Sequence, residues 1–140
     1  MIYCHEMMAS FLIRVILGIL FFAQGYDKVV RVKIKGVIET FEHPIHAKHI
    51  PRFLLVLSSY YTSYVELIGG LLLIIGLTKI YVLGLLGFDL IMVTVAFSMI
   101  TPMWDMQYFF PRMLLLVTLL ILPAQWDVLS IDYFWPILNF

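Results

Sequence analysis

Four ionisable residues lie inside the most apolar parts of this sequence, and they are the residues best suited to chemistry. They are Arg14, Glu66, Asp89 and Arg112. A charged group near the centre of an inserted helix costs about 2.5 to 3.5 kcal/mol, so chains that keep one usually pair it or use it. A guanidinium can polarise a carbonyl oxygen, and a carboxyl can exchange a proton. The pattern therefore predicts a charged interior site or a charged structural network.

The depths of these charges predict which of them meet. With a rise of 1.5 Å per residue, Arg14 lies about 10 Å inside the membrane, Asp89 about 14 Å and Glu66 about 17 Å. We therefore expect Arg14 within salt-bridge distance of Asp89 or Glu66, with all three as candidate catalytic residues. One carboxylate then lacks a partner unless Arg112 reaches inward or one carboxyl is protonated. The alternative is a purely structural network, with Arg112 extended to the headgroups.

Composition indicates that lipid surrounds the elements that carry these charges. Of 140 residues, 63% are hydrophobic and only 13% are charged, which is too apolar for a soluble domain of this length. Nine basic and nine acidic residues give zero net charge, so no nucleic-acid partner is expected. The single cysteine, Cys4, excludes an internal disulfide. The bilayer is the first expected partner.

Long apolar runs predict an all-α fold, a single domain consisting of a bundle of four transmembrane helices. The predicted spans are about 7–26, 53–77, 80–100 and 108–126, with a long loop at 27–52. No lysine or arginine precedes the first span, so we expect an uncleaved anchor rather than a signal peptide.

Basic residues are distributed unevenly between the two sides of the predicted membrane. The 27–52 segment carries six, Lys28, Arg31, Lys33, Lys35, Lys48 and Arg52. The opposite side offers only Lys79. Because lysine and arginine concentrate in cytoplasmic loops, we expect the 27–52 loop in the cytoplasm and both termini outside.

Histidines in the 27–52 loop are the strongest candidates for metal ligands. His46 and His49 are spaced i, i+3 and could share a helix face and a metal ion. Pro44 argues against a continuous helix, and loop histidines beside lysines are usually solvated, so we predict no metal site. All four histidines lie outside the apolar spans, which argues against a transmembrane haem. No nucleotide-binding or zincin motif occurs.

Three runs carry a family resemblance. They are Arg14-Val-Ile-Leu-Gly18 through Gly25-Tyr-Asp-Lys28, Glu66-Leu-Ile-Gly69-Gly70 through Gly76-Leu77, and Leu129-Ser130-Ile131-Asp132. In order and spacing they resemble the DoxX family of small bacterial and archaeal membrane proteins, which includes DoxD/DoxX thiosulfate:quinone oxidoreductase subunits and is related to MauE. Arg14, Gly18, Gly25, Lys28, Glu66 and Gly76 carry the resemblance. The histidine-containing first loop and Arg112 depart from it.

The resemblance implies a four-helix bundle in the prokaryotic cytoplasmic membrane and an association with quinone-linked complexes. We therefore expect a membrane subunit of an electron-transfer complex, with a diffusible quinone and no covalently bound cofactor. Arg14 would polarise a quinone carbonyl, and Glu66 or Asp89 would exchange protons. The alternative is a non-catalytic subunit that stabilises a larger complex with other membrane or membrane-attached subunits. A proton-coupled carrier fits less well, because no span is broken at mid-membrane.

Overall fold

Helices make up almost all of the described chain, as predicted. The computed structural model describes residues 2–46, 51–100 and 106–134. Its elements are α1 (Ile2–Tyr26), the π-helix η1 (Asp27–Arg31), α2 (Lys33–His46), α3 (Arg52–Ile75), α4 (Lys79–Ile100), α5 (Met106–Ile121), the 3₁₀ helix η2 (Ala124–Trp126) and α6 (Ile131–Phe134). The all-α prediction is confirmed, since the described residues include no strand.

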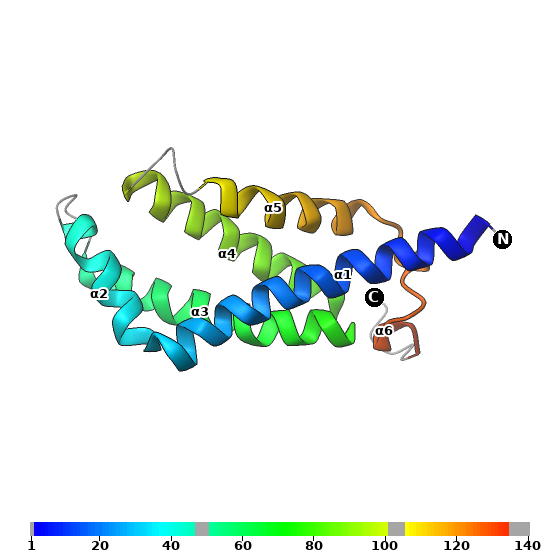
Figure 1. The fold of residues 1–140 in the computed structure, drawn as a ribbon, viewed down its shortest axis with the longest axis horizontal. Coiled ribbons are helices and arrows are strands. Elements are labelled where there is room, and N and C mark those ends of the chain that lie inside the picture. The colour runs from blue at the N-terminus through cyan, green and yellow to red at the C-terminus, as the bar shows by residue number, and fades with distance from the viewer. Residues whose placement is uncertain (1, 47–50, 101–105, 135–140) are drawn as a thin grey trace.

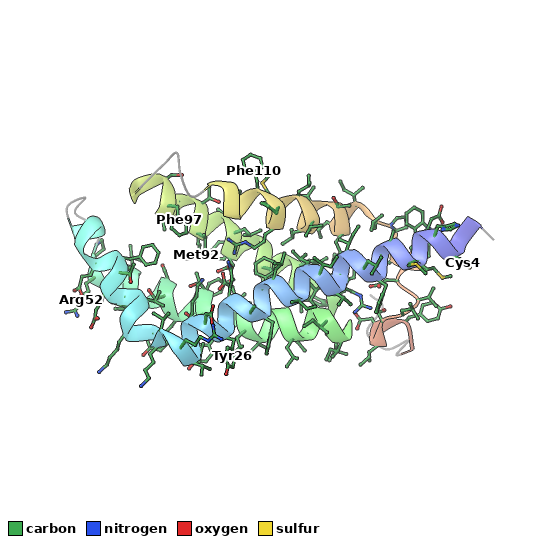
Figure 2. The ribbon with its side chains drawn as sticks, viewed as in Figure 1. Cys4, Tyr26, Arg52, Met92, Phe97 and Phe110 are labelled. Atoms are coloured by element: carbon green, nitrogen blue, oxygen red, sulfur yellow. The ribbon has the colours of Figure 1, made fainter. Side chains whose placement is uncertain are left out.

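Three segments of the described chain are long and apolar enough to cross a membrane. They are Cys4–Arg31, Arg52–Ile75 and Lys79–Ser98, and Phe109–Ile121 adds a shorter apolar helix. Large apolar side chains such as Phe110 point away from the bundle, as they do when lipid surrounds a protein (Figure 2). The chain is therefore a multi-pass membrane protein.

The fourth apolar helix is shorter than predicted. α5 ends at Ile121, whereas the predicted span continued to Trp126. Pro123 explains the difference, because proline has no N–H and restricts the backbone of the residue before it. The chain then turns through η2 and runs back beside α1 to α6 (Figure 1).

The predicted loop at 27–52 is largely helical, which corrects the sequence-based expectation. Ile34, Val37, Ile38 and Phe41 recur at the i, i+3, i+4, i+7 spacing of one helix face, and α2 packs that face toward α3. The helix continues through Pro44 to His46, so the argument from proline against a continuous helix was wrong. The prediction about a metal at His46 and His49 falls on side chains that lie outside the described residues.

α1 and α3 form the most closely packed helix pair of the bundle (Figure 1). A Cβ added at Gly25 would lie 2.2 Å from the backbone nitrogen of Leu67, and one at Gly70 would lie 2.4 Å from that of Phe22. Only glycine allows the two backbones to approach this closely. These contacts fix how far α1 is shifted along α3, and so which side chains of the two helices meet.

An apolar layer fills the interior between the helices. Its fully buried members are Leu17, Phe21, Leu73, Leu83, Leu86 and Leu119. They come from α1, α3, α4 and α5, so all four long helices contribute to one core. This layer separates two groups of buried charges that lie at different depths in the bundle.

Candidate functional site

The buried and half-buried charges form two clusters. The terminal cluster contains Arg14, Lys79, Asp127 and Asp132, and it lies where α3 ends and α4 begins. The central cluster contains Lys28, Glu66, Asp89 and Arg112 and lies deeper in the bundle. Each cluster holds two basic and two acidic residues. A balanced charge lowers the cost of keeping such groups inside a membrane.

Arg14 uses its guanidinium to hold the end of α3 and the segment after α5. Its Nη1 donates to the carbonyl oxygens of Leu73 and Ile74, both at 3.0 Å. Its Nε donates to Asp127 Oδ1 at 3.1 Å, and its Nη2 donates to the Leu129 carbonyl at 2.6 Å. The last carbonyls of a helix have no partner within the helix and carry partial negative charge, so the guanidinium caps α3.

The expected contact of Arg14 with Asp89 or Glu66 is wrong. Glu66 lies two helical turns before Ile74, which places it about 12 Å along α3 from the Arg14 contacts. The prediction counted depth from a first span beginning at residue 7, but α1 begins at Ile2 and its first turns extend past the end of α3 (Figure 1). Arg14 is therefore level with the end of α3.

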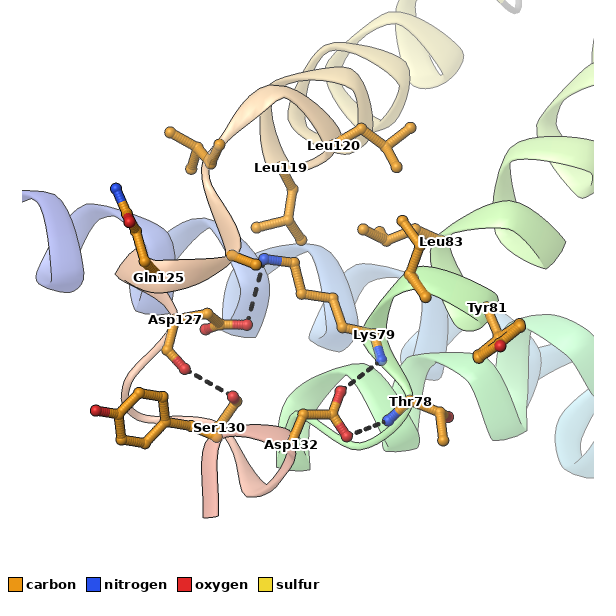
Figure 3. Close-up of a pocket in the computed structure, with 14 residues that line it drawn as sticks. Thr78, Lys79, Tyr81, Leu83, Leu119, Leu120, Gln125, Asp127, Ser130 and Asp132 are labelled. Carbon is orange, nitrogen blue, oxygen red and sulfur yellow. Dashed lines mark hydrogen bonds and ion pairs between the residues drawn. The ribbon is translucent and has the colours of Figure 1, made fainter. Parts of the chain in front are cut away.

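The turn between α3 and α4 is built around the other members of the terminal cluster. Gly76 has φ +74°, and a Cβ there would also lie 2.4 Å from Arg14 Nη1. The Asp132 carboxylate accepts the backbone N–H groups of Thr78 at 2.7 Å and Lys79 at 2.8 Å (Figure 3). Lys79 Nζ lies 3.3 Å from Asp127 Oδ2. These contacts fasten the C-terminal segment to the helix ends.

A cavity of about 600 Å³ lies beside the terminal cluster (Figure 3). Its walls carry apolar side chains from α4 and α5 together with polar groups from the turn after α3 and the segment after α5. The charged groups at its edge, Lys79, Asp127 and Asp132, bind one another or backbone N–H groups. The charged groups of this cavity therefore hold the helix ends together.

Glu66 is the centre of the second cluster. Its Oε2 lies 2.6 Å from Lys28 Nζ, and its Oε1 lies 3.9 Å from Arg112 Nη1. Arg112 also donates to the side-chain oxygen of Gln24. The fully buried carboxyl of Asp89 neighbours that of Glu66. The four members come from η1, α3, α4 and α5, so this cluster ties four elements together.

Arg112 points into the bundle, and only 9% of its side chain is exposed. The alternative in which it extends to the headgroups is therefore wrong. The central cluster also includes Lys28, which the residue types had not indicated as an ion-pair partner. A signal was present, because Lys28 continues the stripe of Arg14, Gly18 and Gly25 at helical spacing.

A cavity of about 770 Å³ opens directly beside the central cluster. Its charged end is formed by Gln24, Asp27, Lys28, Glu66 and Arg112, and Ser58, Ser59 and Thr62 of α3 add hydroxyl groups. Its other walls are mainly apolar and include Val37, Phe41, Leu55, Met92, Phe97 and Phe109. Met92 and Phe97 both lie on α4 (Figure 2). The cavity is thus amphipathic, with its charged groups at one end.

Contacts from α2 cover one side of this cavity. Phe41 packs edge-on against Phe97 of α4, with ring centroids 5.7 Å apart. Glu42 Oε1 accepts from Arg52 Nε at 3.1 Å. α2 therefore links α3 and α4 on this side of the cavity.

The fold and these clusters define a multi-pass helical membrane protein with a charged interior. The sequence matches the model of the DoxX family over residues 9–99, which is more than half of the chain. The protein belongs to the DoxX family. Comparison with curated proteins and comparison with solved structures give no match.

The residues that carry the family resemblance contact one another in space. Lys28 pairs with Glu66, and Gly76 lies against the guanidinium of Arg14. Gly18 and Gly25 lie against the backbone of α3. The matched range ends before Arg112, which completes the central cluster from α5.

Proposed function

We propose that this protein is the quinone-binding membrane subunit of an electron-transfer complex, and that the quinone headgroup binds in the 770 Å³ cavity. The observation that carries the proposal is the amphipathic cavity itself. Two cations and two carboxyls lie at one end of it, and the other walls are mainly apolar, with a few hydroxyl groups. Its volume is within the range of small-molecule sites. A quinone is likewise polar at one end and apolar at the other, since its ring carries carbonyl groups and its tail is a hydrocarbon chain.

In this mechanism the charged end of the cavity binds the quinone headgroup through its carbonyl oxygens. Lys28 and Arg112 line the cavity and donate hydrogen bonds to a carbonyl oxygen, which stabilises negative charge during reduction. They take the role first expected of Arg14, which is bound in the terminal cluster. The two electrons come from a redox centre in a partner subunit, and two protons convert both carbonyls to hydroxyls.

Glu66 and Asp89 act in sequence to supply one of these protons. Glu66 lines the cavity and transfers one proton to the nearer carbonyl oxygen, and the second carbonyl takes its proton from water that enters the cavity. Asp89 lies next to Glu66 but is not among the lining residues, so it returns a proton to Glu66 from behind. Two neighbouring carboxyls readily hold one proton between them, because their negative charges repel each other.

A structural role in a larger complex is the second candidate function. Ion pairs within each cluster favour it, since Lys28 pairs with Glu66 and Arg14 with Asp127. In this role the clusters fix the helix packing, and other membrane or membrane-attached subunits bind outside.

Blocking the cavity tests the quinone site. Ala96 lines the cavity, so Ala96→Trp should fill it and weaken binding of a short-chain quinone by more than about tenfold. The control is Ala23→Trp, because Ala23 is exposed on the outer surface of α1. Equilibrium binding of a radiolabelled quinone to protein in lipid nanodiscs measures the effect. Equal binding by both variants, or no saturable binding by the wild type, contradicts the site.

We also propose that η1 and α2 face the cytoplasm, on the evidence of the basic residues in 27–52. Cys4 and Arg52 lie at opposite ends of the molecule (Figure 2). The exposed native Cys4 should therefore react with a membrane-impermeant maleimide in intact cells. Glu39→Cys in a Cys4→Ser background should react only after lysis, since Glu39 is exposed on α2. The reverse pattern of labelling would invert the topology.

A further inference from the structure

α3 carries a continuous row of large exposed side chains along one face. The row consists of Phe53, Leu57, Tyr60, Tyr64, Ile68, Leu71 and Ile75. The pattern repeats every 11 residues, from Phe53 to Tyr64 and from Tyr64 to Ile75. Because 11 residues make close to three helical turns, the row runs nearly straight along the helix. Lipid explains the apolar members of this row. It does not explain the two tyrosines.

The tyrosines lie near the middle of α3, where a membrane-spanning helix is expected to be surrounded by hydrocarbon. α3 has 24 residues, so it is about 36 Å long. Tyr64 is near its midpoint, and Tyr60 is one turn, about 6 Å, toward the end at Arg52. Tyrosines exposed to lipid usually lie at the interfaces, where the hydroxyl meets headgroups and water.

Neither tyrosine hydroxyl has a hydrogen-bond partner within the described part of the chain. Tyr60 and Tyr64 are 47% and 44% exposed, and their rings stack with centroids 6.4 Å apart. No hydrogen bond to a described residue involves either hydroxyl, whereas the neighbouring Tyr61 donates to the Leu85 carbonyl at 3.3 Å. Hydrocarbon offers no partner, and a polar group left unpaired there is costly. Another protein surface must satisfy them.

We infer that this row is the contact surface for a second copy of this chain, with Tyr60 and Tyr64 each facing its counterpart. All copies insert with the same orientation, so a twofold axis along the membrane normal places equal residues opposite each other. A phenol hydroxyl both donates and accepts, and therefore pairs with an identical hydroxyl. Glu66 lies on the other face of α3 and is buried, so the contact leaves the central cluster and its cavity unobstructed.

Cross-linking tests the position of the contact. In a Cys4→Ser background, Ile68→Cys should form a disulfide-linked dimer when membranes are treated with a mild oxidant. Phe88→Cys on α4 is the control, because Ile68 and Phe88 are both 53% exposed. The control should stay largely monomeric. Absence of the Ile68→Cys dimer, or equal dimer from both positions, overturns the proposal, and so does cross-linking of Ile68→Cys only to a different protein.

Removing the hydroxyls tests their part in the contact. Each hydrogen bond between helices in a membrane is worth about threefold in the association constant. Tyr60→Phe with Tyr64→Phe should therefore weaken the dimer about tenfold. Mass measurements over a range of protein-to-detergent ratios detect this shift. Tyr81→Phe is the control, since Tyr81 is exposed in the first turn of α4. A dimer unchanged by the double substitution, or weakened equally by the control, overturns the proposal.

Discussion

Glu66→Gln is expected to lower quinone-dependent turnover by about 10² to 10⁴-fold while the complex stays assembled. The amide keeps the size of the side chain and can still accept from Lys28, which lies 2.6 Å from Oε2. It cannot deliver and recover a proton at neutral pH. Turnover with a short-chain quinone, measured on the purified complex, checks the result, and copurification of partner subunits checks assembly.

Two comparisons separate catalysis from structure at Glu66. Glu39→Gln changes an exposed carboxyl on α2 and should leave turnover unchanged. Asp89→Asn should slow turnover without abolishing quinone binding, because Asp89 lies behind Glu66. If the Glu66→Gln complex is intact and turns over normally, the catalytic proposal fails. If the complex falls apart instead, the structural role is favoured.

Arg14→Gln is expected to destabilise the fold by about 3 to 5 kcal/mol. The substitution leaves the buried carboxylate of Asp127 without its closest cation and removes the cap on the carbonyls of Leu73 and Ile74. The loss of stability is measured by thermal unfolding in detergent, with the exposure of buried groups as the signal. The effect should be on stability, with quinone binding preserved in the fraction that remains folded.

An exposed arginine provides the matched control for Arg14. Arg31 pairs with Asp27 at 3.1 Å, but 73% of its side chain is exposed. Arg31→Gln should therefore change stability by less than about 1 kcal/mol. The loss of stability caused by Asp127→Asn should lie between those caused by Arg14→Gln and Arg31→Gln, because Arg14 keeps its three carbonyl partners in that variant. Equal effects of Arg14→Gln and Arg31→Gln would contradict the capping role.

The sequence predicted the spans better than it predicted the partners of the charges. Long apolar runs define α1, α3 and α4, because only helices of that length satisfy their backbone in lipid. The partner of Arg14 depends on how far α1 is shifted along α3. Backbone contact at Gly25 and Gly70 sets that shift, and such a contact is a property of the packed pair.

The helix α2 and the role of Asp127 were not predicted, and in both cases a nearby proline explains why. The amphipathic face of α2 is visible in the sequence, but the expectation that Pro44 interrupts the helix was wrong, since the helix continues past it. Asp127 was overlooked because it follows the last predicted span. Pro123 ends α5 early and lets the chain fold back, which brings Asp127 to Arg14. The carboxyls of Glu66 and Asp89 were correctly predicted to face the interior.

The depth of the central cluster makes its charge sensitive to the membrane voltage. Glu66 lies somewhat less than halfway along α3 from its end at Ile75. Each proton that the cluster takes up adds one elementary charge close to the middle of α3. Moving an elementary charge across the whole membrane is worth about 2.3 kcal/mol per 100 mV, so half of that path is worth about 1 kcal/mol. The proton uptake that we propose for Glu66 is therefore expected to be electrogenic, with a change of 100 mV altering the proton occupancy several-fold.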